Sequence, residues 1–178
     1  MPESVAPTYL IVTGASVARR TPEVLRVLAP VAGRLLTLLT PGARRVISPR
    51  ELALVPGHRI IESYFDAAIL PRPAPGVVVI APCTFNTLNK LAAGITDNLA
   101  LSIAAQAIGR RAPLIVAIAV NTPLWAHPRA QESAATLRKW GCTVLDPVAT
   151  DGTVAMASPE TIAAAVRRAR SRLARESA

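Results

Sequence analysis

The segment that most constrains the fold is Val77–Leu101, which reads VVVIAPCTFNTLNKLAAGITDNLAL. It opens on a short run of apolar, mostly β-branched residues, which is typical of a strand buried on both faces of a parallel sheet. Small polar residues follow at once, and apolar residues at helical spacing come next. This order predicts a strand, a polar turn and a helix, with hydrogen-bond donors gathered where a phosphate group could be held.

Strand-like and helix-like segments alternate along the rest of the chain. This alternation predicts an α/β fold with a parallel sheet covered by helices on both faces. The 178 residues suit a single domain over 1–178, with 1–7 and 176–178 expected as flexible ends. The expected strands are Tyr9–Thr13, Arg34–Leu39, Arg59–Ile61, Val77–Ile80, Leu114–Val120 and Thr143–Leu145. The expected helices are Thr21–Ala32 with Thr21 as N-cap, Pro49–Val55 capped by Ser48, Pro128–Trp140 and Ser158–Arg175.

In the helix after the fourth strand, we expect the apolar positions to face the core, and Gly94 allows either a break or a close helix contact. These apolar positions are Leu88, Leu91, Ala92, Ile95 and Leu99. The stretch Glu62–Gly76 contains ILPRPAPG, whose three prolines predict irregular structure. It is either an active-site loop or a plain connector.

Composition excludes several classes of protein. Aromatic residues are 3% of the chain, which leaves little material for stacking against nucleic-acid bases. No apolar run approaches the roughly 18 residues of a membrane span, and the first residues lack the pattern of a signal peptide, so we expect a cytoplasmic protein without membrane contact. Cys83 and Cys142 form no spaced metal motif, which predicts free thiols and no metal site.

The net charge of +9 comes almost entirely from arginine, and much of it lies near the end of the chain, between Arg167 and Arg175. A solvated face of a terminal helix explains such a run without any partner. A nucleic-acid patch and the attraction of an acidic substrate are the alternatives.

Polar residues follow three of the expected strands, at Gly14 and Ser16, at Thr40, and at Thr84, Asn86 and Thr87. Because the carboxyl ends of parallel strands meet at one edge of a sheet, we expect these residues to face one crevice. The dinucleotide fingerprint G-x-G-x-x-G is absent, and taken singly the first three positions would be ordinary turn or cap residues. The cluster at the start of a helix favours an anion site, since free N–H groups point there.

Three blocks of the chain carry a resemblance. APCTFNTLNKLAAGITDNL, at Ala81–Leu99, is similar to the signature of the FMN-binding cysteine decarboxylases. This family includes phosphopantothenoylcysteine decarboxylase and the peptidyl-cysteine decarboxylases of epidermin-type peptide biosynthesis. NTPLWAHP, at Asn121–Pro128, resembles the substrate clamp of that family, and MASPE, at Met156–Glu160, resembles its tail.

The resemblance implies a Rossmann-like three-layer αβα sandwich with about six parallel strands, assembled as a trimer or dodecamer with FMN at the subunit interface. By position, Asn121 would bind the substrate carboxylate and act in catalysis, and Trp125 would complete the clamp. The implied reaction is oxidative decarboxylation of a cysteine-containing substrate, either a peptide C-terminus or a phosphopantothenoylcysteine-like thiol, to an enethiol. The residues implied to contact FMN are Gly14, Ser16, Thr40, Thr84, Asn86 and Thr87.

The chain also departs from the pattern of that family. The family histidine would lie near Leu70, where no histidine occurs, and His58 could replace it as the base only through a different loop path. His127 is expected to be a cap or structural donor. Apolar residues replace three clamp positions, and no cysteine lies near Val148. The replacements are Ile118, Val120 and Leu124.

These departures keep an alternative open, a non-catalytic FMN-binding regulatory or partner subunit. The turn Thr13–Ser16 also suits the related flavin prenyltransferases, whose polar prenyl-phosphate residues are missing from Val116–Val120. Cys83 stands where the family has alanine, and it either approaches the flavin or fills space as a small buried thiol.

Overall fold

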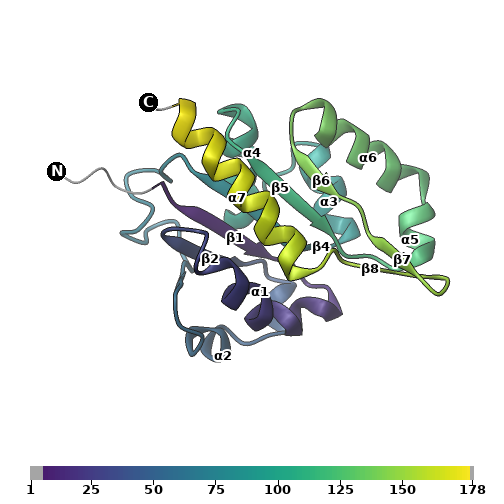
Figure 1. Ribbon diagram of the computed structural model, residues 1–178, viewed down its shortest axis with the longest axis horizontal. Helices are drawn as coiled ribbons and strands as arrows, with labels where there is room; N and C mark the ends of the chain where they lie inside the picture. The colour runs from purple at the N-terminus through teal and green to yellow at the C-terminus, as the bar shows by residue number, and fades with distance from the viewer. Residues whose placement is uncertain (1–5, 177–178) are drawn as a thin grey trace.

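The computed structural model describes residues 6–176 and contains a six-stranded sheet in the order β3-β2-β1-β4-β5-β6. Every neighbouring pair of strands is parallel. The order reverses between β1 and β4, as in doubly wound α/β folds (Figure 1). The predicted Rossmann-like arrangement is therefore confirmed. The strands are β1 (Thr8–Val12), β2 (Leu35–Leu39), β3 (Arg59–Ile60), β4 (Val77–Cys83), β5 (Leu114–Ile118) and β6 (Thr143–Leu145).

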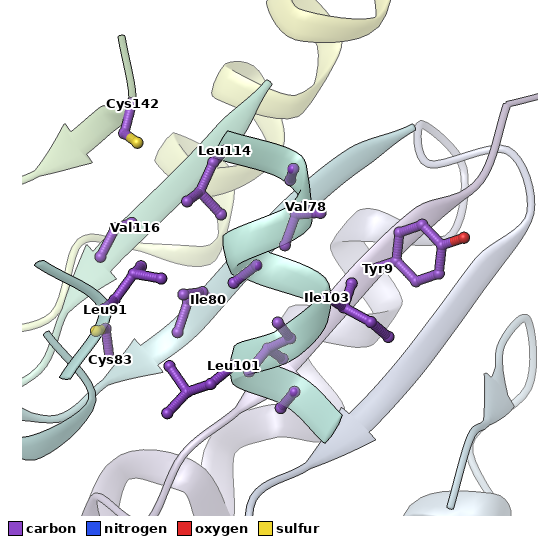
Figure 2. Close-up of a cluster of buried hydrophobic side chains, with 14 of the residues drawn as sticks. Tyr9, Val78, Ile80, Cys83, Leu91, Leu101, Ile103, Leu114, Val116 and Cys142 are labelled. Atoms are coloured by element: carbon purple, nitrogen blue, oxygen red, sulfur yellow. The ribbon is translucent and has the colours of Figure 1, made fainter. Parts of the chain in front are cut away.

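Helices cover both faces of this sheet. On one face lie α1 (Thr21–Leu28), α2 (Pro49–Ala53) and α7 (Pro159–Glu176), and on the other α3 (Phe85–Ala92), α4 (Leu99–Gly109) and α6 (Pro128–Lys139). Alternate residues of β1 supply the two cores, because successive side chains of a strand point to opposite faces. Tyr9 and Ile11 join the α3–α4–α6 core, and Leu10 and Val12 join the other. Figure 2 shows the first of these cores, with Ile103 of α4 and Val78 of β4 among its labelled side chains.

The expected elements are present, most of them to within two residues at each end. The first helix is shorter than expected, because Pro30 has no N–H for a helical hydrogen bond. Thr21 is not its N-cap: the Thr21 hydroxyl donates to Ala18 O at 2.6 Å instead. The break at Gly94 is real, with φ +73°. Beyond it Ile95 leaves the helical path and is 45% exposed, so its predicted place in the core is wrong.

Several elements were not expected from the sequence, among them α4, which follows the break at Gly94, and a 3-10 helix, η2 (Ala43–Arg45), after β2. A 3-10 helix, η1 (Ser16–Arg20), follows β1, and the short helix α5 (Thr122–Ala126) precedes α6. A hairpin of β7 (Val148–Thr150) and β8 (Thr153–Ala155) forms a separate two-stranded sheet.

The segment Glu62–Gly76 contains no helix or strand, as the prolines predicted. It carries the chain from the end of β3 back to the start of β4. Its second half is pinned near the amino ends of the strands, where Tyr9 Oη donates to Ala74 O at 2.9 Å and Arg110 Nη1 donates to Pro73 O at 2.9 Å. This placement favours the connector over the active-site loop. Within residues 6–176, none of the helices has both the length and the apolar character needed to cross a bilayer.

Candidate functional site

The loops that follow β1 and β2 lie against each other at the carboxyl edge of the sheet. A Cβ on Gly14 would lie 2.8 Å from the carbonyl carbon of Gly42, so only glycine fits there without a shift of backbone. The N–H of Thr40 donates to Val12 O at 3.0 Å, which carries the ladder between β1 and β2 past the end of the strands. The Thr40 hydroxyl then accepts from the N–H of Ala43 at 3.2 Å.

The loop after β4 passes directly into α3. Thr84 is the N-cap of this helix, since its Oγ1 accepts from the N–H of Thr87 at 3.3 Å. The same hydroxyl donates to Thr87 Oγ1 at 3.1 Å. The N–H groups of the first turn that the cap does not bind are free for a ligand, and the helix dipole favours an anion there. Asn86 lies exposed in this turn.

Two neighbouring cavities open at these loops. Cavity 1 has a volume of about 400 Å³ and cavity 2 about 650 Å³, and Thr84 and Asn86 line both. Cavity 1 is lined by Gly14, Thr40, Pro41, Gly42, Thr84, Asn86, Thr87, Lys90, Asp97, Asn98 and Leu101. Cavity 2 is lined by Ala15, Ser16, Val17, Thr84, Phe85, Asn86, Ala119, Val120, Asn121, Leu124, Val154, Ala155 and Met156. The structure thus brings the six residues predicted to contact a cofactor together around one double cavity.

Cavity 1 carries one ion pair. The Nζ of Lys90 in α3 forms an ion pair with Asp97 Oδ2, and the Asn98 side-chain amide donates to Asp97 Oδ1 at 3.0 Å. The hydrogen bond from Lys90 holds the pKa of Asp97 below its ordinary value, so the carboxyl stays ionised. Among the described lining residues of both cavities, these two are the only titratable side chains. The described side chains that line the two cavities therefore carry no net charge.

The two predicted clamp residues lie in different surroundings. Asn121 lines cavity 2 and is the N-cap of α5, because its Oδ1 accepts from the N–H of Leu124 at 3.0 Å. With the oxygen used in this way, the amide N–H groups are left to donate toward a ligand. Trp125 does not line either cavity, and its side chain packs against the α3–α4–α6 core. The clamp role of Trp125 stays a prediction.

The structure does not bring His58 to the cavities. Its Nδ1 lies 2.8 Å from Thr37 Oγ1, and its Nε2 lies 2.9 Å from Leu52 O. A carbonyl can only accept, so Nε2 donates to Leu52 O, while Nδ1 and the Thr37 hydroxyl share the second hydrogen bond. Both ring nitrogens join β2 to α2, which is a structural role. Because neither nitrogen is free and the ring lies outside both cavities, this position gives no support to His58 as a base, and that role stays a prediction.

His127 caps α6, as expected, with Nδ1 accepting from the N–H of Arg129 at 3.0 Å. Its ring meets Phe85 edge-on, with centroids 5.4 Å apart. Cys83 is fully buried in the α3–α4–α6 core, and burial raises the pKa of its thiol far above the usual range. It does not line either cavity, which favours the filler interpretation.

The sequence pattern that defines the Flavoprotein family matches residues 3–171. The chain belongs to this family. It is 32% identical over 177 residues to phosphopantothenoylcysteine decarboxylase of Mus musculus, covering 88% of this chain and 83% of the mouse protein. It is 30% identical over 141 residues to the coenzyme A biosynthesis bifunctional protein of Mycobacterium tuberculosis, covering 76% of this chain. The alignment spans only 33% of that mycobacterial protein.

Among solved structures, the flavoprotein fold seen here is similar to the FMN-dependent cysteine decarboxylase SpaF. The TM-score is 0.78 at 25% identity, over 96% of this chain and 98% of SpaF. This agreement over nearly the whole length confirms the fold inferred from the sequence blocks.

Several lining residues of this flavoprotein were not assigned a role from the sequence. Lys90, Asp97 and Asn98 lie within the quoted Ala81–Leu99 block, so the block itself was the signal for them. The β7–β8 hairpin, which supplies Val154 and Ala155 to cavity 2, could have been found from Asp151-Gly152 between β-branched residues. Both turn residues have positive φ, 46° and 76°, as such a hairpin turn requires.

Proposed function

We propose that this flavoprotein binds FMN in the double cavity and catalyses oxidative decarboxylation of a cysteine-containing thiol. The observation that carries the proposal is the convergence of hydroxyl, amide and helix N-terminal N–H donors beside Asn121 at one edge of the sheet. The mouse relative named a phosphopantothenoylcysteine decarboxylase and the similarity to an FMN-dependent cysteine decarboxylase support the same reaction.

The residues present suit FMN. A phosphate ester needs donors without nearby free carboxylates, and Thr84, Asn86 and Ser16 meet this need. The single carboxylate of the wall, Asp97, is neutralised by Lys90. Each of the two cavities has a volume within the range of cofactor sites, roughly 300–1,000 Å³. The close approach of Gly14 to Gly42 holds together the two loops that line cavity 1.

When bound, FMN supplies the two-electron oxidation of the cysteine, after which loss of CO₂ leaves an enethiol. The chain positions the substrate: the free amide N–H groups of Asn121 suit a carboxylate, and the apolar wall of cavity 2 around Leu124 and Met156 excludes water. The cavity is open to either substrate expected from the sequence, a peptide ending in cysteine or a phosphopantothenoylcysteine-like thiol.

The decisive experiment combines FMN binding with a mass assay. Purified protein is titrated with FMN and then incubated with cysteine-terminated peptides and with phosphopantothenoylcysteine. We expect a substrate to lose CO₂ and two hydrogens, about 46 mass units. If FMN binds and no cysteine compound loses this mass, the catalytic part of the proposal is wrong.

Asn121→Asp sharpens this experiment, because aspartate caps helices as well as asparagine does. The variant keeps α5 and its stability but turns the amide donors into a carboxylate that repels the substrate carboxylate. We expect turnover to fall at least tenfold with FMN affinity unchanged. Ser48→Asp is the control: Ser48 caps α2 through its Oγ, at 3.2 Å from the N–H of Arg50, and lines neither cavity, so a carboxylate there should leave turnover and FMN affinity unchanged.

A second function is favoured by one specific observation, the shortage of an acid–base group. Lys90 and Asp97 are paired, and His58 is used in the β2–α2 contact, so no described lining residue offers a free proton acceptor. The second candidate is an FMN-binding regulatory or partner subunit without turnover. It predicts that the FMN-loaded protein is inert toward all cysteine substrates and that Asn121→Asp leaves its biological activity intact.

We also propose self-association as a trimer or dodecamer with FMN at the subunit interface. Large apolar side chains left exposed on this chain, Phe65 at 85% and Leu70 at 50%, support such burial. Light scattering coupled to gel filtration tests the assembly, and Phe65→Ser is expected to weaken it. The cytoplasmic location expected from the sequence stays a prediction.

A further inference from the structure

Thr13 is completely buried at the carboxyl end of β1, and its hydroxyl bridges two strands. The Thr13 Oγ1 donates to Pro82 O at 2.7 Å and accepts from the N–H of Thr84 at 3.0 Å. Both partners belong to the corner that joins β4 to α3. A single side chain therefore uses its donor and an acceptor lone pair to bind the main chain on both sides of Cys83.

This corner needs an outside partner. The pairing of β4 with β5 shifts register between Ile80 and Cys83, so the regular ladder is interrupted there. An unpaired N–H or C=O buried at such a place costs as much as a lost hydrogen bond. The hydroxyl of Thr13 supplies the partner for the Pro82 carbonyl and for the Thr84 N–H, and so fixes the path of the corner.

The two ends of this bridge lead directly to the cavities. Gly14, the next residue after Thr13, lines cavity 1, and Thr84 lines both cavities and caps α3. Thr13 itself lines neither cavity, so it does not touch a ligand there. Its hydroxyl instead sets the separation between the loop after β1 and the first turn of α3.

We propose that Thr13 is a positioning residue for FMN, which holds the loop after β1 and the start of α3 at the spacing the cofactor requires. This inference rests on the proposed FMN binding. Replacing the hydroxyl by a methyl group, in Thr13→Val, keeps the shape and removes both hydrogen bonds. We expect the FMN dissociation constant to rise about tenfold, as for the loss of one well-placed hydrogen bond.

The same strand offers a matched control at its other end. Thr8 is also completely buried, and its hydroxyl donates to Ala32 O at 2.7 Å, far from the cavities along β1. The experiment compares Thr13→Val, Thr13→Ser and Thr8→Val by urea unfolding without FMN and by the quenching of FMN fluorescence on binding. We expect both valine variants to lose similar stability, only Thr13→Val to lose FMN affinity, and Thr13→Ser to restore it.

The outcomes distinguish the positioning role of Thr13 from the proposed binding of FMN. Equal FMN affinities for the two valine variants, or a serine variant that fails to restore binding, overturn the positioning role while leaving the proposed function standing. If the unmodified protein binds no FMN, the proposed function is wrong and the inference falls with it. Should Thr13→Val not fold, Thr13→Cys replaces it, since a thiol is a much weaker donor and acceptor, and its FMN affinity must then lie below that of Thr13→Ser.

Discussion

The two edges of the sheet are built from the same strands but in opposite ways. At the amino edge, long side chains reach across to carbonyls: Arg170 Nη1 lies 2.7 Å from Ala6 O and 2.9 Å from Ala32 O, and Arg110 binds Pro73 O. The cavity beside Tyr9 there measures only about 10 Å³. At the carboxyl edge, short hydroxyls make the links, and cavities of about 400 and 650 Å³ remain.

This difference explains how one sheet can be tightly packed at the amino ends of its strands and keep cavities at their carboxyl ends. Long arginine and tyrosine side chains fill space as they bind, so they close the amino edge. Threonine side chains are short, so their hydroxyls bind only the backbone next to them and leave the volume beyond free. We therefore expect substitutions at the amino edge to change the free energy of unfolding, and comparable substitutions at the carboxyl edge to change ligand affinity more than stability.

The largest effect is expected at Gly76, on the amino edge. A Cβ at this position would lie 2.1 Å from Pro7 O, a backbone atom that also accepts from the N–H of Val77 at 3.0 Å. Gly76→Ala should lower the free energy of unfolding by about 3 kcal/mol, measured in urea, because the start of β4 must move. FMN affinity of the folded fraction should not change. Gly109→Ala, where a Cβ meets nothing within 4 Å, is the control and should not destabilise.

The corresponding change on the carboxyl edge is Gly14→Ala. Here the added Cβ lies 2.8 Å from Gly42 C, and two loops rather than a strand must separate. We expect a loss of about 1–2 kcal/mol in unfolding free energy and at least a tenfold loss of FMN affinity. A variant that lost stability as Gly76→Ala does, but bound FMN normally, would remove the distinction between the edges.

A smaller effect is expected for His58→Gln. This change removes a ring that joins Thr37 to Leu52 O, which should cost about 1 kcal/mol of unfolding free energy. Turnover, KM and FMN affinity should remain those of the unmodified protein, because the ring lies outside both cavities. A fall in kcat beyond the loss of folded protein would restore His58 as a base.

The smallest effect is expected in the reactivity of the two thiols, Cys142 and Cys83, toward a disulfide reagent. Burial raises the pKa of Cys142 from 9.0 to about 11, which leaves about a hundredfold less thiolate at pH 8 than a free cysteine has. Its labelling by a disulfide reagent should therefore speed up as the pH rises toward 11, while the fully buried Cys83 should react only on unfolding. Since the folded pKa is the higher one, the folded state loses stability as the pH rises through this range. Rapid labelling of Cys83 in the folded protein would show that the α3–α4–α6 core opens without global unfolding.

Much of the fold could be predicted from the sequence because its signals are local. The β-branched run of β4 and the helix start after Pro82 each depend on a few neighbouring residues, and both are where the sequence analysis placed them. The exposure of Ile95 could not be predicted from helical spacing alone, because a positive φ at Gly94 redirects the chain. The proline segment could be predicted as irregular but not as pinned to Tyr9 and Arg110.

The candidate site was predictable in its residue types but not in its geometry. Parallel topology was enough to bring Thr40 and Thr84 to one edge. The approach of Gly14 to Gly42 joins loops of two different strands, and no spacing within either loop predicts it. Trp125 and His58 were placed by resemblance and by distance along the chain. Their contacts with the core and with Thr37 depend on packing between distant segments.

The course of α7 has a practical consequence. The helix begins just after Met156, beside cavity 2, and runs back until Arg170 binds the residues around the start of β1. Figure 1 accordingly shows the start of β1 and the end of α7 on the same side of the molecule, away from the β7–β8 hairpin. An affinity tag, a fluorescent fusion or a sensor surface joined before β1 or after α7 should therefore lie away from the loops that line the cavities, so immobilised protein can be used to measure flavin and thiol binding directly.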